Sequence, residues 1–184
     1  MPFEFKALEI PGPKLVLSKN FPDPRGVFAE TYKEPDFHAA GLKDRFIQDN
    51  ISRSVKGVIR GLHFQKSAYA QAKLVCCLAG RVLDVAVDIR RGSPHYGKWV
   101  SRVLDGASWD MLYVPEGFAH GFAVLSDSAL VSYKVSGPYA PEHSRGICWN
   151  DPALGIDWQV GTPVLSGPDA KWPPLSSCDN DFSF

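Results

Sequence analysis

The stretch Val82-Leu83-Asp84-Val85-Ala86-Val87-Asp88-Ile89 decides the fold class, because apolar and polar side chains alternate along it with a period of two. On an extended strand this spacing separates two faces, one with Leu83, Val85, Val87 and Ile89 and the other with Asp84 and Asp88. The stretch therefore predicts a β-strand whose two faces differ in character.

Comparable alternating runs lie on both sides of this stretch. They occupy residues 58–64, 73–78, 99–104, 111–114, 121–125 and 129–135. Turn-forming pairs such as Ala79-Gly80 and Asp105-Gly106 separate them. Because many short strands at this spacing are typical of a sandwich or a barrel, we predict an all-β fold.

Helices are expected to be few and short. One is predicted at residues 35–40, where Gly41 ends it, and another around residues 152–154. The chain has no internal repeat and no linker, so residues 1–184 are predicted to form a single domain. Its Pro- and Ser-rich tail, from about residue 171, is predicted to lie extended over the surface.

Composition excludes several classes of function. The 20 Lys and Arg residues balance the 20 Asp and Glu residues, so the protein has no long-range field that would gather nucleic acid. No apolar run approaches the roughly 20 residues that cross a bilayer, and the N-terminal residues lack the pattern of a secretory signal. We therefore expect a cytoplasmic protein that binds neither membrane nor nucleic acid polymer.

A metal site is not expected from the distribution of cysteine and histidine. The four cysteines, Cys76, Cys77, Cys148 and Cys178, contain no Cys-x-x-Cys pair and are predicted to be reduced thiols that pack in the interior. A metal-binding barrel usually supplies two histidines two residues apart on one strand, and this chain has no His-x-His.

Three predicted strands carry side chains that could transfer a proton next to a carbonyl group. His63 has the pKa range of a general base, the Lys73 ammonium could stabilise an enolate oxygen, and the Tyr133 phenol could return a proton from the other face. Taken singly, each has a simpler explanation as a core or surface residue, so only the combination points to catalysis. Strand parity also places Arg60 opposite His63, unless Gly61 marks a bulge.

Ordered motifs along nearly the whole chain resemble those of the dTDP-4-dehydrorhamnose 3,5-epimerase family. They are residues 21–30 (FPDPRGVFAE), 48–50 (QDN), 58–65 (VIRGLHFQ), 71–75 (QAKLV), 84–90 (DVAVDIR), 114–122 (VPEGFAHGF), 133–134 (YK) and 149–158 (WNDPALGIDW). Any one of these motifs alone would be weak. Their order and spacing together make the resemblance specific.

The resemblance implies a cupin-type jelly roll, no metal or other cofactor, and a homodimer whose N-terminal strands contribute to the neighbour's sheet. By position, His63 resembles the family's base and Asp169 the carboxylate that fixes its tautomer. Lys73 resembles the oxyanion stabiliser, and Tyr133 resembles the acid on the opposite face.

The resemblance also implies a set of residues that bind nucleotide or sugar. They are Arg25, Glu30, Gln48, Asn50, Arg60, His120 and Tyr139, the last resembling the aromatic that stacks on thymine. Ser144 stands where the family usually has Glu, and Pro168 where it usually has Lys. Both positions contact the ligand in the family, so nucleotide and sugar selectivity stay open, with Glu142 and Lys171 as possible substitutes.

The expected substrate is a dTDP-linked 4-keto-6-deoxyhexose, dTDP-4-dehydro-6-deoxy-D-glucose, and the expected reaction is epimerisation at C3 and C5 to dTDP-4-dehydro-L-rhamnose. Two alternatives remain open at this point. One is an epimerase that acts at C3 only or C5 only, and the other is a cupin that binds a sugar nucleotide without turnover. A metal-dependent cupin enzyme is disfavoured by the missing His-x-His.

Overall fold

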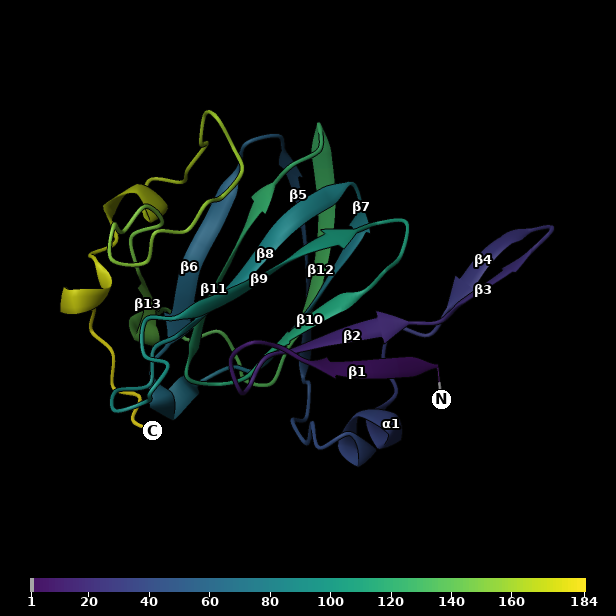
Figure 1. Ribbon diagram of the computed structural model, residues 1–184, viewed down its shortest axis with the longest axis horizontal. Coiled ribbons are helices and arrows are strands. Elements are labelled where there is room, and N and C mark those ends of the chain that lie inside the picture. Colours follow the sequence, from purple (N-terminus) through teal and green to yellow (C-terminus); the bar gives the residue numbers. More distant parts are fainter. Residues whose placement is uncertain (1) are drawn as a thin grey trace.

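Two antiparallel β-sheets face each other in the computed structural model, which describes residues 2–184 (Figure 1). The larger sheet has six strands in the spatial order β1 (Phe3–Ala7), β2 (Lys14–Ser18), β10 (Met111–Val114), β7 (Lys73–Ala79), β12 (Ser128–Val135) and β5 (Gln48–Val55). The smaller sheet has five strands in the order β13 (Ser144–Gly146), β6 (Ile59–Gln65), β11 (Phe118–Val124), β8 (Arg81–Asp88) and β9 (Trp99–Asp105). This arrangement confirms the all-β prediction.

The remaining elements are small. Strands β3 (Asn20–Asp23) and β4 (Gly26–Ala29) form a separate hairpin, which projects from the body of the molecule at the right of Figure 1. The helical elements are α1 (Glu34–Ala39) and the short 3-10 turns η1 (Ser67–Tyr69), η2 (Pro141–His143), η3 (Asp169–Lys171) and η4 (Leu175–Ser177). None of the helices described between residues 2 and 184 is long and apolar enough to span a membrane.

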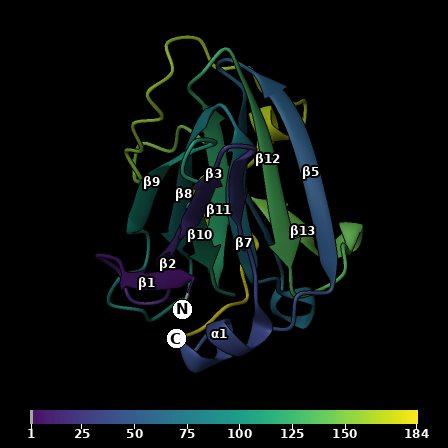
Figure 2. The ribbon, with the colours of Figure 1, turned by 90° about the vertical axis from the view of Figure 1, so that its right-hand side faces the viewer.

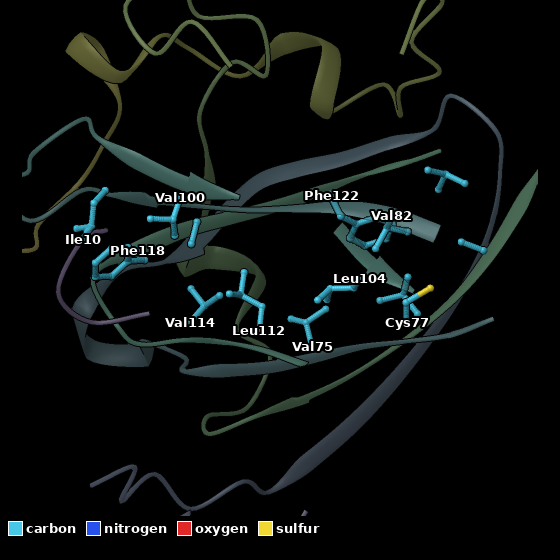
Figure 3. Close-up of a cluster of buried hydrophobic side chains, with 14 residues drawn as sticks. Ile10, Val75, Cys77, Val82, Val100, Leu104, Leu112, Val114, Phe118 and Phe122 are labelled. Atoms are coloured by element: carbon cyan, nitrogen blue, oxygen red, sulfur yellow. The ribbon is translucent and has the colours of Figure 1, made fainter. Parts of the chain in front are cut away.

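One hydrophobic cluster fills the space between the two sheets (Figure 3). It is built by alternate residues of facing strands, including Val82 and Ala86 of β8 and Val75 and Cys77 of β7. Val75 and Cys77 point toward the space between the sheets. Lys73 has the same parity on β7, so its side chain lies on the same inner face.

The outer face of the five-stranded sheet is also apolar, and the chain after β13 covers it. Leu83, Val85, Val87 and Ile89 of the β8 region are 2% exposed or less, and they pack with residues that follow β13, among them Leu154, Trp158, Leu175 and Cys178. The predicted separation of the two faces of β8 is therefore confirmed. Both faces are buried, and the aspartates lie on the inner one.

Two predictions for the C-terminal region were wrong. Residues 152–154 form a turn closed by hydrogen bonds from the Leu154 and Gly155 amides to the Asp151 carbonyl, because Gly155 stops the chain from continuing as a helix. The tail after residue 171 is not simply extended over the surface. It contains η4, and Leu175, Cys178 and Asn180 are buried.

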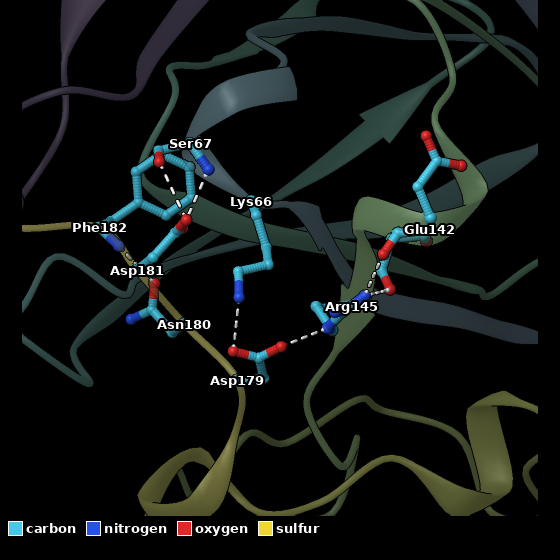
Figure 4. A network of polar contacts seen from close by, with 9 residues as sticks. Lys66, Ser67, Glu142, Arg145, Asp179, Asn180, Asp181 and Phe182 are labelled. Carbon is cyan, nitrogen blue, oxygen red and sulfur yellow. Dashed lines mark hydrogen bonds and ion pairs between the residues drawn. The ribbon is translucent and has the colours of Figure 1, made fainter.

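Polar contacts hold the end of the tail to the body of the protein (Figure 4). The Asp179 carboxylate accepts hydrogen bonds from Lys66 Nζ and Arg145 Nε, both at 2.8 Å. The Asp181 carboxylate accepts from the backbone amide and the hydroxyl of Ser67. The tail is therefore bound to Lys66 and Ser67, which follow β6, and to Arg145 of β13.

A third cluster packs α1 against the outer face of the six-stranded sheet. Phe37 of α1 is 1% exposed and stacks edge-on against Phe3 and Phe5 of β1. The helix predicted at residues 35–40 is confirmed with a shift of one residue. Cys76 belongs to this cluster, whereas Cys77 belongs to the one between the sheets. All four cysteines are free thiols, but Cys148 is only partly buried, unlike the other three.

Strand β6 changes parity at Gly61. The pairing of β11 with β6 joins His120 to His63 but Phe122 to Arg60, so the register shifts between them. Gly61 has φ +133°, and a Cβ atom there would lie 2.5 Å from Gly121 Cα. The irregularity brings Arg60 and His63 to the same cavity, as the bulge hypothesis required.

Replacing Gly61 by alanine is expected to destabilise the protein, because alanine is strained at this φ and its Cβ meets the β11 backbone. We expect a loss of about 1–3 kcal/mol or more, which corresponds to a fall in Tm of about 2–4 °C per kcal/mol. Gly161→Ala is the control, since a Cβ atom at Gly161 would have no neighbour within 4 Å. Thermal denaturation of the two variants checks this, and equal Tm values would contradict it.

Candidate functional site

A cavity of about 530 Å³ is lined by residues of both sheets. Nine of the eleven predicted site residues line it, namely Gln48, Asn50, Arg60, His63, Lys73, His120, Tyr133, Tyr139 and Asp169. They come from β5, β6, β7, β11, β12, η3 and the segment between β12 and β13. Residues far apart in sequence are thus brought to one site.

His63 and Asp169 form a hydrogen-bonded pair in the wall of this cavity. His63 Nε2 lies 2.5 Å from Asp169 Oδ1, and the Asp169 side chain is almost completely buried while His63 is open to the cavity. Burial alone would raise the pKa of Asp169, but hydrogen bonds from His63, Ser166 and Trp172 hold it below its usual value. The carboxylate is therefore charged and fixes the imidazole.

Lys73 lies beside His63 at the start of β7. Its Nζ is 3.5 Å from the His63 carbonyl oxygen. Burial lowers the pKa of Lys73 to about 8, while the charge of Asp84 acts in the opposite direction. The ammonium form still predominates at neutral pH, and because Lys73 is buried its charge can act strongly on a nearby oxyanion.

A second histidine–carboxylate pair lies deeper in the same interior. His120 Nε2 is 2.6 Å from Asp84 Oδ1, and both side chains are buried. Burial lowers the pKa of His120, and Asp84 partly offsets this. Asp84 Oδ2 has no hydrogen-bond partner among the described residues. The predicted polar face of β8 therefore supplies negative charge to the interior next to Lys73 and His120.

Tyr133 faces the cavity from the six-stranded sheet, whereas His63 belongs to the five-stranded one. Burial raises the pKa of Tyr133, and the positive charge of Arg60 offsets part of the rise, so the phenol is protonated at neutral pH. Arg60 is held by a hydrogen bond of 3.0 Å from its Nε to Ser54 Oγ. A carboxylate-bound imidazole and a protonated phenol therefore face the cavity from opposing sheets.

Amide side chains shape the outer end of the cavity. Gln48 Nε2 donates to Asn50 Oδ1 at 2.8 Å, and Tyr139 is 64% exposed at the mouth. Gln65 is buried and donates to the carbonyls of Tyr69 and Pro138, while its Oε1 accepts from the Ala140 amide. The segment that carries Tyr139 is therefore fixed to β6.

Sequence reasoning missed several residues that line or support this site. Gln65, Gln71, Phe122, Ser166 and Trp172 all line the cavity. Gln65 and Gln71 stood within the family motifs, and a Gln among apolar strand residues could have signalled a buried hydrogen-bonding role. Trp172 follows Asp169 by three residues, but the Pro- and Ser-rich composition around it pointed to a surface tail.

The two departures from the family pattern also lie at the cavity. Ser144 and Pro168 line it, and the two residues considered as substitutes, Glu142 and Lys171, are not among the described lining residues. Ser144 is the first residue of β13, and Pro168 precedes η3. Both departures from the family pattern therefore fall on the cavity wall, and Pro168 directly precedes Asp169.

Arg25 and Glu30 are also outside the lining as described for residues 2–184. Arg25 lies in the tight turn between β3 and β4 with its guanidinium on Asp23, and Glu30 follows β4. The hairpin carries exposed Phe28 and Val27, which are 65% and 51% exposed.

Among residues 2–184, no group of three or more His, Cys, Asp or Glu side chains is arranged to hold a metal ion.

Comparison with known proteins agrees with this geometry. A family model described as dTDP-4-dehydrorhamnose 3,5-epimerase matches residues 7–177. The dTDP-4-dehydrorhamnose 3,5-epimerase of Sinorhizobium fredii is 47% identical over 98% of this chain and 92% of its own length. The dTDP-4-dehydrorhamnose 3-epimerase of Streptomyces niveus is also 47% identical, over 80% of this chain and 72% of its own.

Solved structures extend the similarity to the fold. The dTDP-6-deoxy-D-glucose-3,5-epimerase of Legionella pneumophila, determined with dTDP-4-keto-L-rhamnose, superposes with a TM-score of 0.93. It shares 44% identity with this chain over 95% of this chain and 94% of that one. The two-sheet architecture is thus the cupin-type jelly roll that the motifs implied, and the chain belongs to the dTDP-4-dehydrorhamnose 3,5-epimerase family.

Proposed function

We propose that this protein epimerises dTDP-4-dehydro-6-deoxy-D-glucose at C3 and C5, giving dTDP-4-dehydro-L-rhamnose. The observation that carries the proposal is the placement of a carboxylate-bound histidine and a protonated tyrosine on opposing sheets of one cavity. The family match and the similarity to an enzyme solved with dTDP-4-keto-L-rhamnose support it.

His63 is the base in this proposal. The C4 ketone of the substrate acidifies the hydrogens on C3 and C5, because the resulting carbanion is stabilised as an enolate. The ring nitrogen of His63 that Asp169 does not hold takes the proton, and the charged carboxylate stabilises the imidazolium that forms. Asp169 thus orients the base without taking the proton itself.

Lys73 and Tyr133 complete the reaction. The Lys73 ammonium stabilises the enolate oxygen at C4, and preorganised charge of this kind is often the largest catalytic contribution. Tyr133 then donates its phenolic proton to the opposite face of the carbanion, which inverts the stereocentre. The carbon gains the proton that the phenol loses, and exchange with solvent returns both residues to their starting states.

Nucleotide binding is assigned to the outer part of the cavity. Gln48 and Asn50 offer amide groups for the edge of the thymine, Tyr139 offers an exposed ring for stacking, and Arg60 and His120 contact the sugar or diphosphate. Because epimerisation leaves the oxidation state unchanged, the reaction needs no redox cofactor. We place it in the cytoplasm, where sugar nucleotides are made.

We further propose that the protein acts as a homodimer. The β3–β4 hairpin is a two-stranded ribbon with exposed apolar residues, and such a ribbon is marginally stable by itself. Strand β5 is the edge of the six-stranded sheet (Figure 2), and its Ile51 and Val55 are more than 60% exposed. Pairing of one protomer's hairpin with the partner's β5 covers both, and it brings Arg25 and Glu30 to the partner's cavity.

Double epimerisation predicts that deuterium from the solvent enters both C3 and C5 of the sugar. Proton NMR in deuterium oxide, with dTDP-4-dehydro-6-deoxy-D-glucose as substrate, follows the two signals separately. Loss of both is expected for the wild-type protein, and loss of only one would identify a single-site epimerase. His63→Ala should slow both exchanges by about 10²–10⁴-fold, and unchanged exchange in this variant would exclude His63 as the base.

The lowered pKa of Lys73 predicts a loss of activity in mild alkali. The reaction needs the ammonium form, so kcat/KM should fall as the pH rises through about 8. Tyr133 titrates higher, because burial raises its pKa. The residual activity of Lys73→Arg should not show this fall at alkaline pH, since a guanidinium stays charged throughout that pH range. A limb that persists in this variant would assign the titration to another group.

The proposed dimer predicts complementation between two defective variants. Arg25→Ala and His63→Ala each impair activity, but a mixed dimer has one cavity with an intact His63 and an intact hairpin from its neighbour. Co-expression with two affinity tags, followed by an activity assay of the mixed dimer, should recover about half of the wild-type activity per dimer.

The matched control is a mixed dimer of His63→Ala with Tyr133→Phe. Both residues act in the cavity of their own protomer, so neither cavity is complete and no recovery is expected. Recovery in the control, or its absence in the test pair, would contradict the exchange of hairpins between protomers.

A further inference from the structure

The indole of Trp172 contacts Asp169, although Trp172 takes no part in the proton transfer described above. Its Nε1 lies 3.2 Å from Asp169 Oδ1, which is the same oxygen that contacts His63 Nε2. The ring also lies edge-on to the His63 imidazole, with the two centroids 6.4 Å apart. One carboxylate oxygen thus accepts from two aromatic N–H donors.

The backbone of β13 makes room for this ring. A Cβ atom at Gly146 would lie 2.5 Å from three atoms of the indole, and Gly146 pairs with His63 across the β13–β6 ladder. The φ of Gly146 is not one that requires glycine, so close approach of the indole is what excludes a side chain here. Trp172 is therefore seated against the strand next to the one that carries the base.

We propose that Trp172 is a positioning residue, whose indole N–H holds the Asp169 carboxylate in the orientation and charge state that His63 needs to act as a base. This inference rests on the proposed function of His63. Trp172 does not itself transfer a proton, and its indole N–H acts only through Asp169. Gly146 allows the indole to occupy this position.

Loss of the indole hydrogen bond should strengthen the interaction between Asp169 and the protonated form of His63. A hydrogen bond donated to a carboxylate stabilises its charge and weakens its attraction for a second donor. Without the indole N–H, Asp169 binds the protonated form of His63 more strongly, so His63 keeps its proton to higher pH. The other charged and titratable groups around His63 are unchanged by this removal; they are Lys73, His120, Asp84, Arg60 and Tyr133.

Trp172→Phe tests the proposal, because it removes the N–H and keeps an aromatic ring. The acid limb of kcat/KM should move up by roughly half a pH unit to one unit. We expect kcat to fall about tenfold near neutral pH, with KM changed less than about twofold. A residue that only packs against His63 and Asp169 would leave the acid limb where it is.

Trp99→Phe is the matched control. Trp99 Nε1 donates to the Leu154 carbonyl at 2.8 Å on the outer face of the same sheet, and Trp99 is not among the residues that line the cavity. This variant loses one partly buried indole hydrogen bond, as Trp172→Phe does, and should keep the wild-type pH profile. An equal shift in both variants would overturn the proposal.

A second readout does not depend on turnover. Nitrogen NMR of protein labelled at histidine follows the protonation of the His63 ring directly, with His63→Asn to assign its signals. The His63 midpoint should rise in Trp172→Phe by the same amount as the kinetic limb. If the wild-type protein fails to turn over the sugar nucleotide but this midpoint still rises, the function proposed above fails while the role of Trp172 stands.

Gly146→Ala provides a variant that keeps the indole but displaces it. Its added methyl group cannot coexist with the present ring position, so the His63 midpoint should move in the same direction as in Trp172→Phe. If Trp172→Phe does not fold, the His63 midpoint in Gly146→Ala tests the role of Trp172. An unchanged His63 midpoint in the variants that fold overturns the proposal.

Discussion

The burial of the outer face of the five-stranded sheet is the constraint on which the catalytic geometry depends. Leu83, Val85 and Val87 would present a continuous apolar surface to water if nothing covered them. The chain after β13 packs across this surface through Leu154, Trp158 and Leu175 and shields it. On its way, this segment brings Asp169 and Trp172 to the edge of the sheet beside His63. The packing of this segment on the sheet thus places the Asp169 carboxylate beside His63.

The inner side of the same sheet creates the opposite condition, because it buries charged and polar side chains. Asp84 is completely buried and shares its interior with His120 and Lys73. Charges in such a place act more strongly on one another and on a ligand than they would in water. The lowered pKa of Lys73 and the raised pKa of Tyr133 are two results of this burial. The proposed proton transfer next to a ketone uses both forms, with the Lys73 cation stabilising the enolate and the neutral Tyr133 phenol acting as the acid.

Much of the fold could be predicted from strand periodicity, because apolar and polar side chains alternate with a clear period of two along the buried strands. This pattern predicted the strands from β6 to β12. It did not predict β5 (QDNISRSV), β13 or the N-terminal strands, and the last were expected only through the resemblance. An edge strand with polar residues on both faces has no clear period. The covering segment was also missed, since residues such as Leu175 and Cys178 are spaced irregularly between prolines. Its burial is decided by the sheet it covers and not by its own pattern.

The predicted site residues were reached by two different routes. His63, Lys73 and Tyr133 could be proposed from their chemistry, but Asp169 was reached only through the resemblance, because no local pattern ties a loop aspartate to a histidine 106 positions away. The conflict between the parities of Arg60 and His63 was real, and the register shift at Gly61 resolves it. Arg25 was chosen by the same resemblance, and one protomer alone does not bring it to the cavity.

In the proposed mechanism the sugar reacts between the two sheets, with the base on one side and the acid on the other. A crystal structure of the protein with a bound dTDP-hexose would show where the sugar lies. We expect the hexose ring to lie between the His63 imidazole and the Tyr133 phenol, with its C4 oxygen next to Lys73 Nζ. A ring bound with His63 and Tyr133 on the same face, or with C4 turned away from Lys73, would contradict it.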